Sequence, residues 1–200
     1  KVFYKNALPN EIPQMSVGLL LDESGSMCSC DRCTYARSSA IILYDFCKAL
    51  HIPVTVYGHS TSGSSVELYS YAEFESIDND DKYRLMDIAA RGSNRDGAAL
   101  RFVAEQLVKR PEEVKILILV SDGQPAAPGY YGSAAEEDLR GIKQEYRRKG
   151  VLFIAAAIGE DKQNIERIYG DSFMDITDLN QLPVKLTAAV KRLSLIHISE

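Results

Sequence analysis

The sequence predicts a doubly wound α/β fold, in which helices cover both faces of a mostly parallel central sheet. Segments with strand character alternate with segments of helical periodicity along the chain. The strands at 16–22, 114–123 and 151–159 are apolar nearly throughout, which is typical of parallel strands buried on both faces. A short turn at 61–65, TSGSS, joins two further strands into an expected hairpin, which adds one antiparallel edge strand.

The first half of the chain is expected to hold a long helix between its strands. Residues 1–15 contain two prolines and no clear period, so we interpret them as an arm or linker from an upstream region. Apolar residues recur every three or four positions from 33 to 50, which predicts an amphipathic helix. The hairpin strands follow at 53–60 and 66–74, and helical character returns at 80–90.

The second half continues the alternation. An amphipathic helix is expected at 98–110, where Pro111 stops it. A further helix at 133–150 carries acidic residues early and basic residues late, in agreement with its dipole, and ends in a glycine. A short helix, a strand and a final helix are expected at 161–169, 173–177 and 179–193.

Bulk composition limits the classes of function. The chain has 200 residues with a net charge of −5, which suits one domain over residues 16–193 and provides no basic field for nucleic acid. No apolar run approaches the roughly 20 residues of a membrane span. With four cysteines and no recognisable signal peptide, a cytoplasmic location is the expectation. The tail at 194–200 departs from the helical pattern and resembles an artefactual read-through.

Two of the buried strands end in an aspartate. The run LLL leads into Asp22, and LILVS leads into Asp122. In open α/β sheets ligands bind at the carboxyl ends of the strands, so both carboxylates are expected at one binding site. Ser24 and Ser26 follow Asp22 in the sequence DESGS and add two hydroxyl groups. Hard oxygen ligands of this kind favour Mg²⁺, with Mn²⁺ or Ca²⁺ as alternatives.

These residues carry a resemblance to a known family. DESGS matches the D-x-S-x-S signature of von Willebrand factor A (vWA) domains, whose metal-ion-dependent adhesion site (MIDAS) binds a divalent cation. SDGQP at 121–125 is similar to the second aspartate loop of that family, and GSNRDGAAL at 92–100 stands where the family has its middle loop. The resemblance implies a Rossmann-like vWA fold and a metal held by Asp22, Ser24, Ser26 and Asp122.

The middle loop departs from the family pattern. Asn94 stands where the family usually has a threonine ligand, and Asp96 follows two residues later. Either residue could be the ligand, and Asp96 is expected at or beside the metal. A directly bound Asp96 would make the site net negative, whereas Asn94 would keep it receptive to an acidic partner.

The sequence NRDGAALR, which overlaps the middle loop, indicates a narrower group of vWA domains. It resembles the vWA domains of nitric oxide reductase activation protein and of the vWA subunit of cobaltochelatase. This resemblance implies a non-catalytic, Mg²⁺-dependent protein-interaction module that works with a chelatase-like or MoxR-type AAA+ ATPase in metal insertion or metalloenzyme maturation. The expected partner supplies a carboxylate to the metal and is the ATPase or its client.

Several other residues are candidates for binding. Cys28, Cys30 and Cys33 form a C-x-C-x-x-C cluster that could hold a soft metal or respond to redox, although Cys47 is too far along the helix to complete it. His59 is expected at the rim of the site as a surface residue. Tyr130 and Tyr131, in the loop after Asp122, are expected to form a further part of a partner-contact rim.

Other readings of the same residues remain open. The aspartates could simply cap helices, although two such strand ends beside a D-x-S-x-S loop make this a weak explanation. Ser24 lacks the G-x-S-x-G context of a nucleophile, and no phosphate-binding loop is present in the sequence. A metal-dependent hydrolase and an extracellular adhesion-type vWA domain are the alternative functions.

Overall fold

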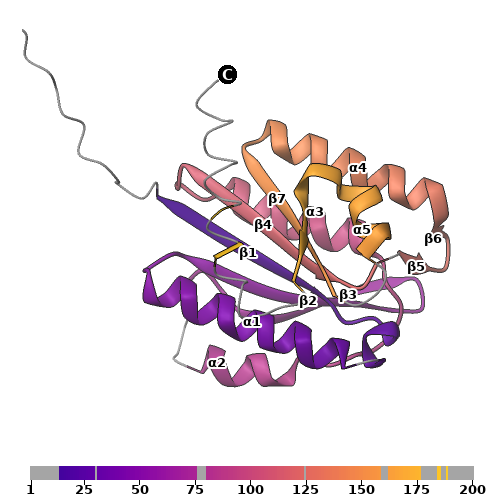
Figure 1. Ribbon diagram of the computed structural model, residues 1–200, viewed down its shortest axis with the longest axis horizontal. Helices are drawn as coiled ribbons and strands as arrows, with labels where there is room; N and C mark the ends of the chain where they lie inside the picture. Colours follow the sequence, from indigo (N-terminus) through magenta and orange to yellow (C-terminus); the bar gives the residue numbers. More distant parts are fainter. Residues whose placement is uncertain are drawn as a thin grey trace, which may run out of the picture.

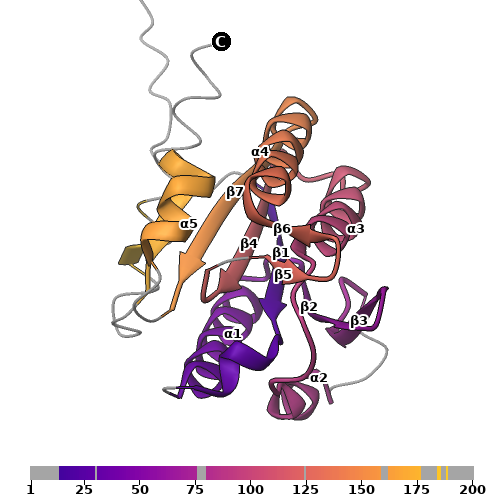
Figure 2. The ribbon, with the colours of Figure 1, turned by 90° about the vertical axis from the view of Figure 1, so that its right-hand side faces the viewer.

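The computed structural model describes residues 14–29, 31–75, 80–123, 125–158, 162–176, 184–185 and 188. Within these ranges a six-stranded sheet has the order β3-β2-β1-β4-β7-β8, and helices lie on both of its faces (Figures 1 and 2). This is the predicted doubly wound α/β architecture.

The strands of the sheet are parallel except for β3 at one edge. Strand β1 lies in the middle and pairs in parallel with both β2 and β4, and β7 and β8 continue the parallel order. Strand β3 pairs antiparallel with β2, as the predicted hairpin requires. The six strands are β1 (Met15–Asp22), β2 (Val54–Ser62), β3 (Ser65–Ala72), β4 (Val114–Ser121), β7 (Val151–Ala157) and β8 (Phe173–Asp175).

Two helical layers enclose this sheet. Helix α1 packs on one face together with the segment that contains α2, while α3, α4 and α5 pack on the other (Figure 2). The helices are α1 (Arg32–Ala49), α2 (Asp81–Arg84), α3 (Asp96–Val108), α4 (Gly132–Arg148) and α5 (Lys162–Tyr169). Short 3₁₀ turns occupy Gly25–Cys28, Leu85–Asp87 and Gly170–Ser172.

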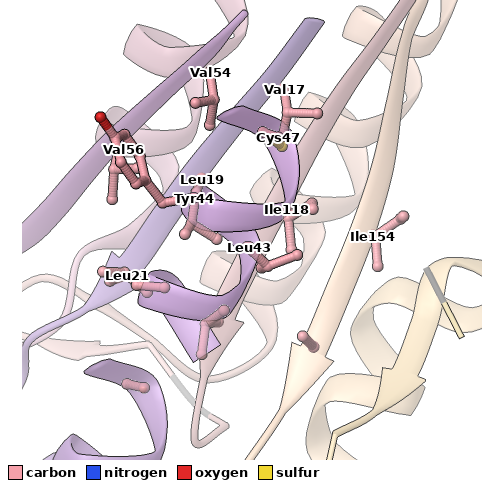
Figure 3. Packing of buried hydrophobic residues seen from close by; sticks show 14 of the residues in the cluster. Val17, Leu19, Leu21, Leu43, Tyr44, Cys47, Val54, Val56, Ile118 and Ile154 are labelled. Carbon is pink, nitrogen blue, oxygen red and sulfur yellow. The ribbon is translucent and has the colours of Figure 1, made fainter. Parts of the chain in front are cut away.

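Each face of β1 supplies one of two hydrophobic cores, because successive side chains of a strand point to opposite faces. Leu19 and Leu21 pack against Leu43 and Cys47 of α1 (Figure 3). Leu20 points the other way and belongs to the core beneath α3 and α4. The apolar run is therefore buried on both sides, and Asp22 is the first carboxylate at its end.

The structure differs from the sequence prediction in two segments. The helix expected at 80–90 is replaced by a short α-helix and a 3₁₀ turn that ends at Asp87, and the Ile88 carbonyl accepts hydrogen bonds from the Arg37 guanidinium. A small hairpin of β5 (Ala126–Ala127) and β6 (Tyr130–Tyr131) was not predicted. Most of the helix expected at 179–193, the arm before residue 14 and the tail at 194–200 lie outside the described residues.

Among the described residues, no helix is both long enough and apolar enough to cross a membrane.

Gly18 allows β1 and α3 to pack closely, and this contact generates a prediction. A Cβ atom at Gly18 would lie 2.7 Å from Cγ1 of Val103 and 3.0 Å from Cδ1 of Leu107. Gly18→Ala should therefore lower the free energy of unfolding by roughly 1–3 kcal/mol through overpacking. Urea denaturation would measure the change.

Gly141 provides the matched control. It lies within α4, where an added Cβ meets no atom within 4 Å. Gly141→Ala should raise the free energy of unfolding by about 0.5–1 kcal/mol, because alanine loses less backbone entropy in a helix. Equal effects of the two substitutions would contradict close packing at Gly18.

Candidate functional site

Asp22 is buried at the carboxyl end of the central strand, with 1% of its surface exposed. Its Oδ1 accepts a hydrogen bond from the Ser24 main-chain N–H at 2.8 Å. Its Oδ2 accepts one from Nδ2 of Asn94 and one from Oγ of Ser121, both at 2.8 Å. One carboxylate thus joins the loop after β1, the middle loop and the end of β4.

The two serines connect Asp22 to Asp122. Oγ of Ser24 lies 2.9 Å from Oγ of Ser26, and the Ser26 side chain is close enough to Asp122 to lower the pKa of that carboxyl in part. The second aspartate is held from the other side by Arg32, whose guanidinium lies 2.7 Å from its Oδ2. The structure therefore brings the D-x-S-x-S loop and Asp122 together at one edge of the sheet.

Burial makes both carboxyl groups weaker acids than usual. Desolvation and the nearby Asp96 charge raise the pKa of Asp22 above its ordinary value. Desolvation and the Asp22 charge raise the pKa of Asp122 as well, although Arg32 partly offsets this. The ionised forms are thus disfavoured at this edge of the sheet, and an additional positive charge there would stabilise them.

Asn94 and Asp96 of the middle loop contact different partners. Asn94 faces Asp22, and its Oδ1 is buried without a hydrogen-bond partner. Asp96 begins α3, and its Oδ1 lies 3.0 Å from Nε2 of His59. That distance is within ion-pair range, but neither atom makes a directional hydrogen bond, so the contact is electrostatic. In this arrangement Asn94 contacts Asp22 and Asp96 contacts His59.

His59 is fully buried, and this corrects its prediction as a surface residue of the rim. It lies on an interior strand, two residues after Tyr57, and so points to the same face of the sheet, where α3 begins. Burial alone would lower the pKa of His59, but the Asp96 and Asp22 carboxylates outweigh it and raise that pKa. The side chain thus serves as an internal partner of Asp96.

The residues present fit a hard divalent cation. Asp22, Asp122 and the two serine hydroxyls are oxygen donors, and the unpartnered Oδ1 of Asn94 is a further buried oxygen. Among the described residues, no three His, Cys, Asp or Glu side chains form a metal-binding group. A cation here would therefore depend on hydroxyl and amide oxygens as well as carboxylates.

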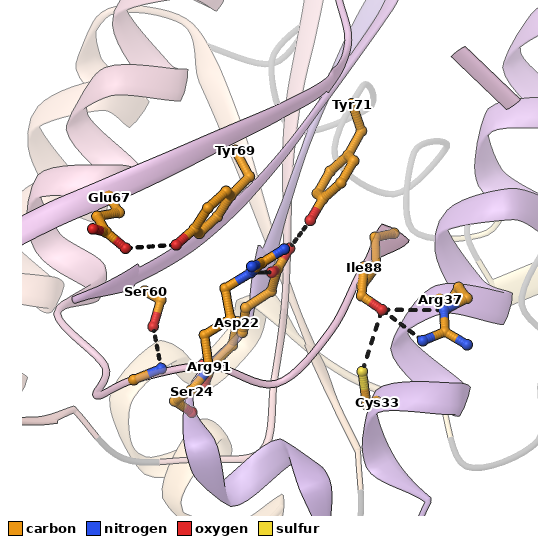
Figure 4. Close-up of polar contacts among 12 residues, drawn as sticks. Asp22, Ser24, Cys33, Arg37, Ser60, Glu67, Tyr69, Tyr71, Ile88 and Arg91 are labelled. Atoms are coloured by element: carbon orange, nitrogen blue, oxygen red, sulfur yellow. Dashed lines mark hydrogen bonds and ion pairs between the residues drawn. The ribbon is translucent and has the colours of Figure 1, made fainter. Parts of the chain in front are cut away.

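Glu23 is a part of the site that sequence reasoning missed. Its carboxylate is 1% exposed and accepts hydrogen bonds from the Tyr71 hydroxyl at 2.5 Å and from Nε of Arg91 at 2.7 Å (Figure 4). The main chain reinforces this link, because the Arg91 N–H donates to the Glu23 carbonyl and the Gly25 N–H donates to the Gly92 carbonyl, both at 2.6 Å. The loop after β1 and the middle loop are thus held together.

The Glu23 carboxylate also restricts the residue type at position 58 of β2. A Cβ atom at Gly58 would lie 1.8 Å from Oε1 of Glu23, so only glycine leaves room for it. The sequence signal was a glutamate at the variable position of D-x-S-x-S, directly after a buried strand.

Comparison with known families decides the family of this chain. The model described as the cobalamin biosynthesis protein CobT VWA domain matches residues 84–196, which is more than half of the 200 residues. The chain belongs to this vWA family. The predicted relationship to the vWA domains of CobT and of NorD is confirmed.

Relatives of this vWA domain are longer proteins. YojO of Bacillus subtilis strain 168, described as uncharacterized, is 26% identical over 207 residues, which cover 96% of this chain and 32% of YojO. NorD of Brucella suis biovar 1 is 33% identical over 103 residues, which cover 50% of this chain and 16% of NorD. The chain spans a third or less of the length of these relatives.

Solved structures support the vWA fold. The pilus adhesin SpaC of Lactobacillus rhamnosus GG in its open conformation has a TM-score of 0.66 at 14% identity, covering 92% of this chain and 30% of SpaC. A von Willebrand factor type A protein of Catenulispora acidiphila has a TM-score of 0.59 at 17% identity, covering 89% of this chain and 42% of that protein. At these identities the similarity establishes the fold alone.

The tyrosines of the vWA domain's β6 strand differ in exposure. Tyr131 is 69% exposed, whereas the Tyr130 ring is partly buried and its hydroxyl donates a 2.8 Å hydrogen bond to Asp138. Residues 129–135 around them line a surface cavity of about 480 Å³. Of the two predicted contact residues, Tyr131 is therefore the one that projects from the surface.

The cysteine cluster is only partly described. Cys28 is exposed, and Sγ of Cys33 lies 3.6 Å from the Ile88 carbonyl oxygen (Figure 4), while Cys30 lies outside the described residues. Cys47 is buried in the core beneath α1, and burial raises the pKa of its thiol to about 12. Cys47 is thus a core residue, as its place on the helix stripe predicts.

The Glu23 contacts predict a large loss of stability when the carboxylate is removed. Glu23→Ala leaves the Tyr71 hydroxyl and the Arg91 guanidinium without their buried acceptor. We expect the free energy of unfolding to fall by roughly 2–4 kcal/mol, measured by urea denaturation.

Glu67→Ala is the control, because it removes an exposed glutamate that bonds to the Tyr69 hydroxyl at 2.5 Å. Its effect should be about 0.5 kcal/mol or less. A Glu23→Ala protein as stable as the control would show that the buried contacts contribute little.

Proposed function

We propose that this vWA domain is a Mg²⁺-dependent protein-interaction module of a chelatase-like or MoxR-type AAA+ ATPase-associated protein. It would serve metal insertion or metalloenzyme maturation. The observation that carries the proposal is the convergence of Asp22, Ser24, Ser26 and Asp122 at one end of the parallel sheet.

The charges of these residues support a divalent cation. Burial raises the pKa of both carboxyls, with the Asp96 charge adding to the rise at Asp22 and the Asp22 charge adding to the rise at Asp122. A cation with two positive charges would balance the two carboxylates and stabilise their ionised forms. Asp22, Ser24, Ser26 and Asp122 would hold it, and the unpartnered oxygen of Asn94 stands beside them. Mn²⁺ and Ca²⁺ accept the same hard oxygen donors. A bound cation would offer a coordination position to a carboxylate of the partner protein.

The relatives support the kind of assembly. The matching family is named for a cobalamin biosynthesis protein, and NorD is similar over half of this chain. Both similarities favour an accessory subunit. The chain spans only part of these proteins, and we propose the ATPase partner and the client on the basis of the similarity of that part.

The site residues favour binding over catalysis. Asp22 is held by three hydrogen bonds, Asp122 by Arg32, and Asp96 by His59. A general base needs a free acceptor within reach of a substrate proton, and these carboxylates are committed to internal partners. Mg²⁺-dependent hydrolysis of a phosphate ester, abolished by Asp22→Asn, would contradict this part of the proposal.

Calorimetric titration with Mg²⁺ tests the site itself. Asp22→Asn keeps the shape of the side chain and removes its charge, so we expect the dissociation constant to rise by at least about tenfold. Ser24→Ala removes a neutral donor and should cost less.

Asp45→Asn is the matched control, because Asp45 is an exposed carboxylate of α1 that pairs with Lys82. It should leave Mg²⁺ affinity unchanged. A parent protein without Mg²⁺ binding, or an Asp22→Asn protein that binds as the parent does, would refute the metal site.

A further inference from the structure

Arg32 lies directly against the candidate site. It is the first residue of α1, and its NH1 lies 2.7 Å from Oδ2 of Asp122. Only 15% of the Arg32 side chain and 6% of the Asp122 side chain are exposed. A short, charge-assisted contact with so little water around it is stronger than an ordinary surface ion pair.

The position of Arg32 is unfavourable for the helix alone. The amino end of a helix carries partial positive charge and favours acidic residues, yet the first turn of α1 contains none. Asp31, which precedes Arg32, adopts a left-handed conformation with φ of 57° and makes no capping hydrogen bond through its side chain. A cation at this helix end needs a compensating contact, and Asp122 supplies it.

We infer that Arg32 is a built-in counter-cation of Asp122 that competes with a divalent cation and so sets the metal affinity of the site. This inference rests on the proposed function. In the protein without metal, the Arg32 guanidinium neutralises Asp122, which is one of the two carboxylates of the site. When a divalent cation binds to these carboxylates, the guanidinium becomes a neighbouring like charge that opposes binding.

The size of the effect follows from Coulomb's law. A unit charge a few ångströms from a divalent cation, in a partly solvated site, changes the dissociation constant on the order of tenfold. Arg32→Gln should therefore bind Mg²⁺ about tenfold more tightly than the parent protein in calorimetry at low salt. Arg32→Lys keeps the charge and should bind nearly as the parent does.

Arg148→Gln is the matched control for net charge. Arg148 ends α4 just before β7 starts, which places it at the opposite end of the sheet from Asp122. Its affinity for Mg²⁺ should equal that of the parent. Added NaCl should reduce the difference between Arg32→Gln and the parent, because salt screens the charge.

A measurement on the parent protein avoids any folding defect of the variants. The Nε–Hε NMR signal of Arg32, assigned by its loss in Arg32→Lys, should shift during Mg²⁺ titration with the same midpoint as the calorimetric curve. An Arg32 signal that does not move, or an Arg32→Gln affinity equal to or weaker than that of the parent, overturns the inference and leaves the metal site standing.

The remaining outcomes separate the two proposals. If the parent binds Mg²⁺, Arg32→Gln binds it more tightly and the Arg32 signal shifts, both proposals are supported. If neither protein binds Mg²⁺, the proposed function fails and the inference fails with it.

Discussion

The burial of the Asp22 carboxylate at the end of β1 is the constraint on which this end of the molecule depends. An ionised carboxylate in a core is costly unless hydrogen bonds or opposite charges compensate it. Here Ser24, Asn94 and Ser121 each donate a hydrogen bond to it. These donors come from three different segments, so the demand of one buried group draws the loop after β1, the middle loop and the end of β4 together.

The neighbouring charges are arranged around the same constraint. Asp122 is paired with Arg32, and Glu23 is paired with Arg91, so acidic groups near Asp22 have basic partners. The two pairs differ in consequence. The Glu23 carboxylate is fully buried and its pair fixes the loops, whereas the Arg32 pair involves a carboxylate that is itself a candidate metal ligand. The first pair provides rigidity, and the second connects the charge of the site to metal binding.

The fold could be predicted because its signals are local. The apolar runs that end in Asp22 and Asp122, together with the short hairpin turn, were sufficient to predict a mostly parallel sheet with both aspartates at one edge. The contacts of Glu23 and His59 could not be predicted in this way. They depend on which face of β2 and β3 meets the loop after β1, and on side chains from segments far apart in the sequence. Periodicity carries no information about such pairs.

A crystal soaked in Mn²⁺ would test the central claim most directly, since anomalous scattering identifies the ion and its ligands together. The account predicts an anomalous peak between Asp22 and Asp122, with oxygen atoms of Asp22, Ser24 and Ser26 among the ligands. A protein that binds no Mn²⁺ at this edge of the sheet, or binds it only elsewhere, would contradict the account.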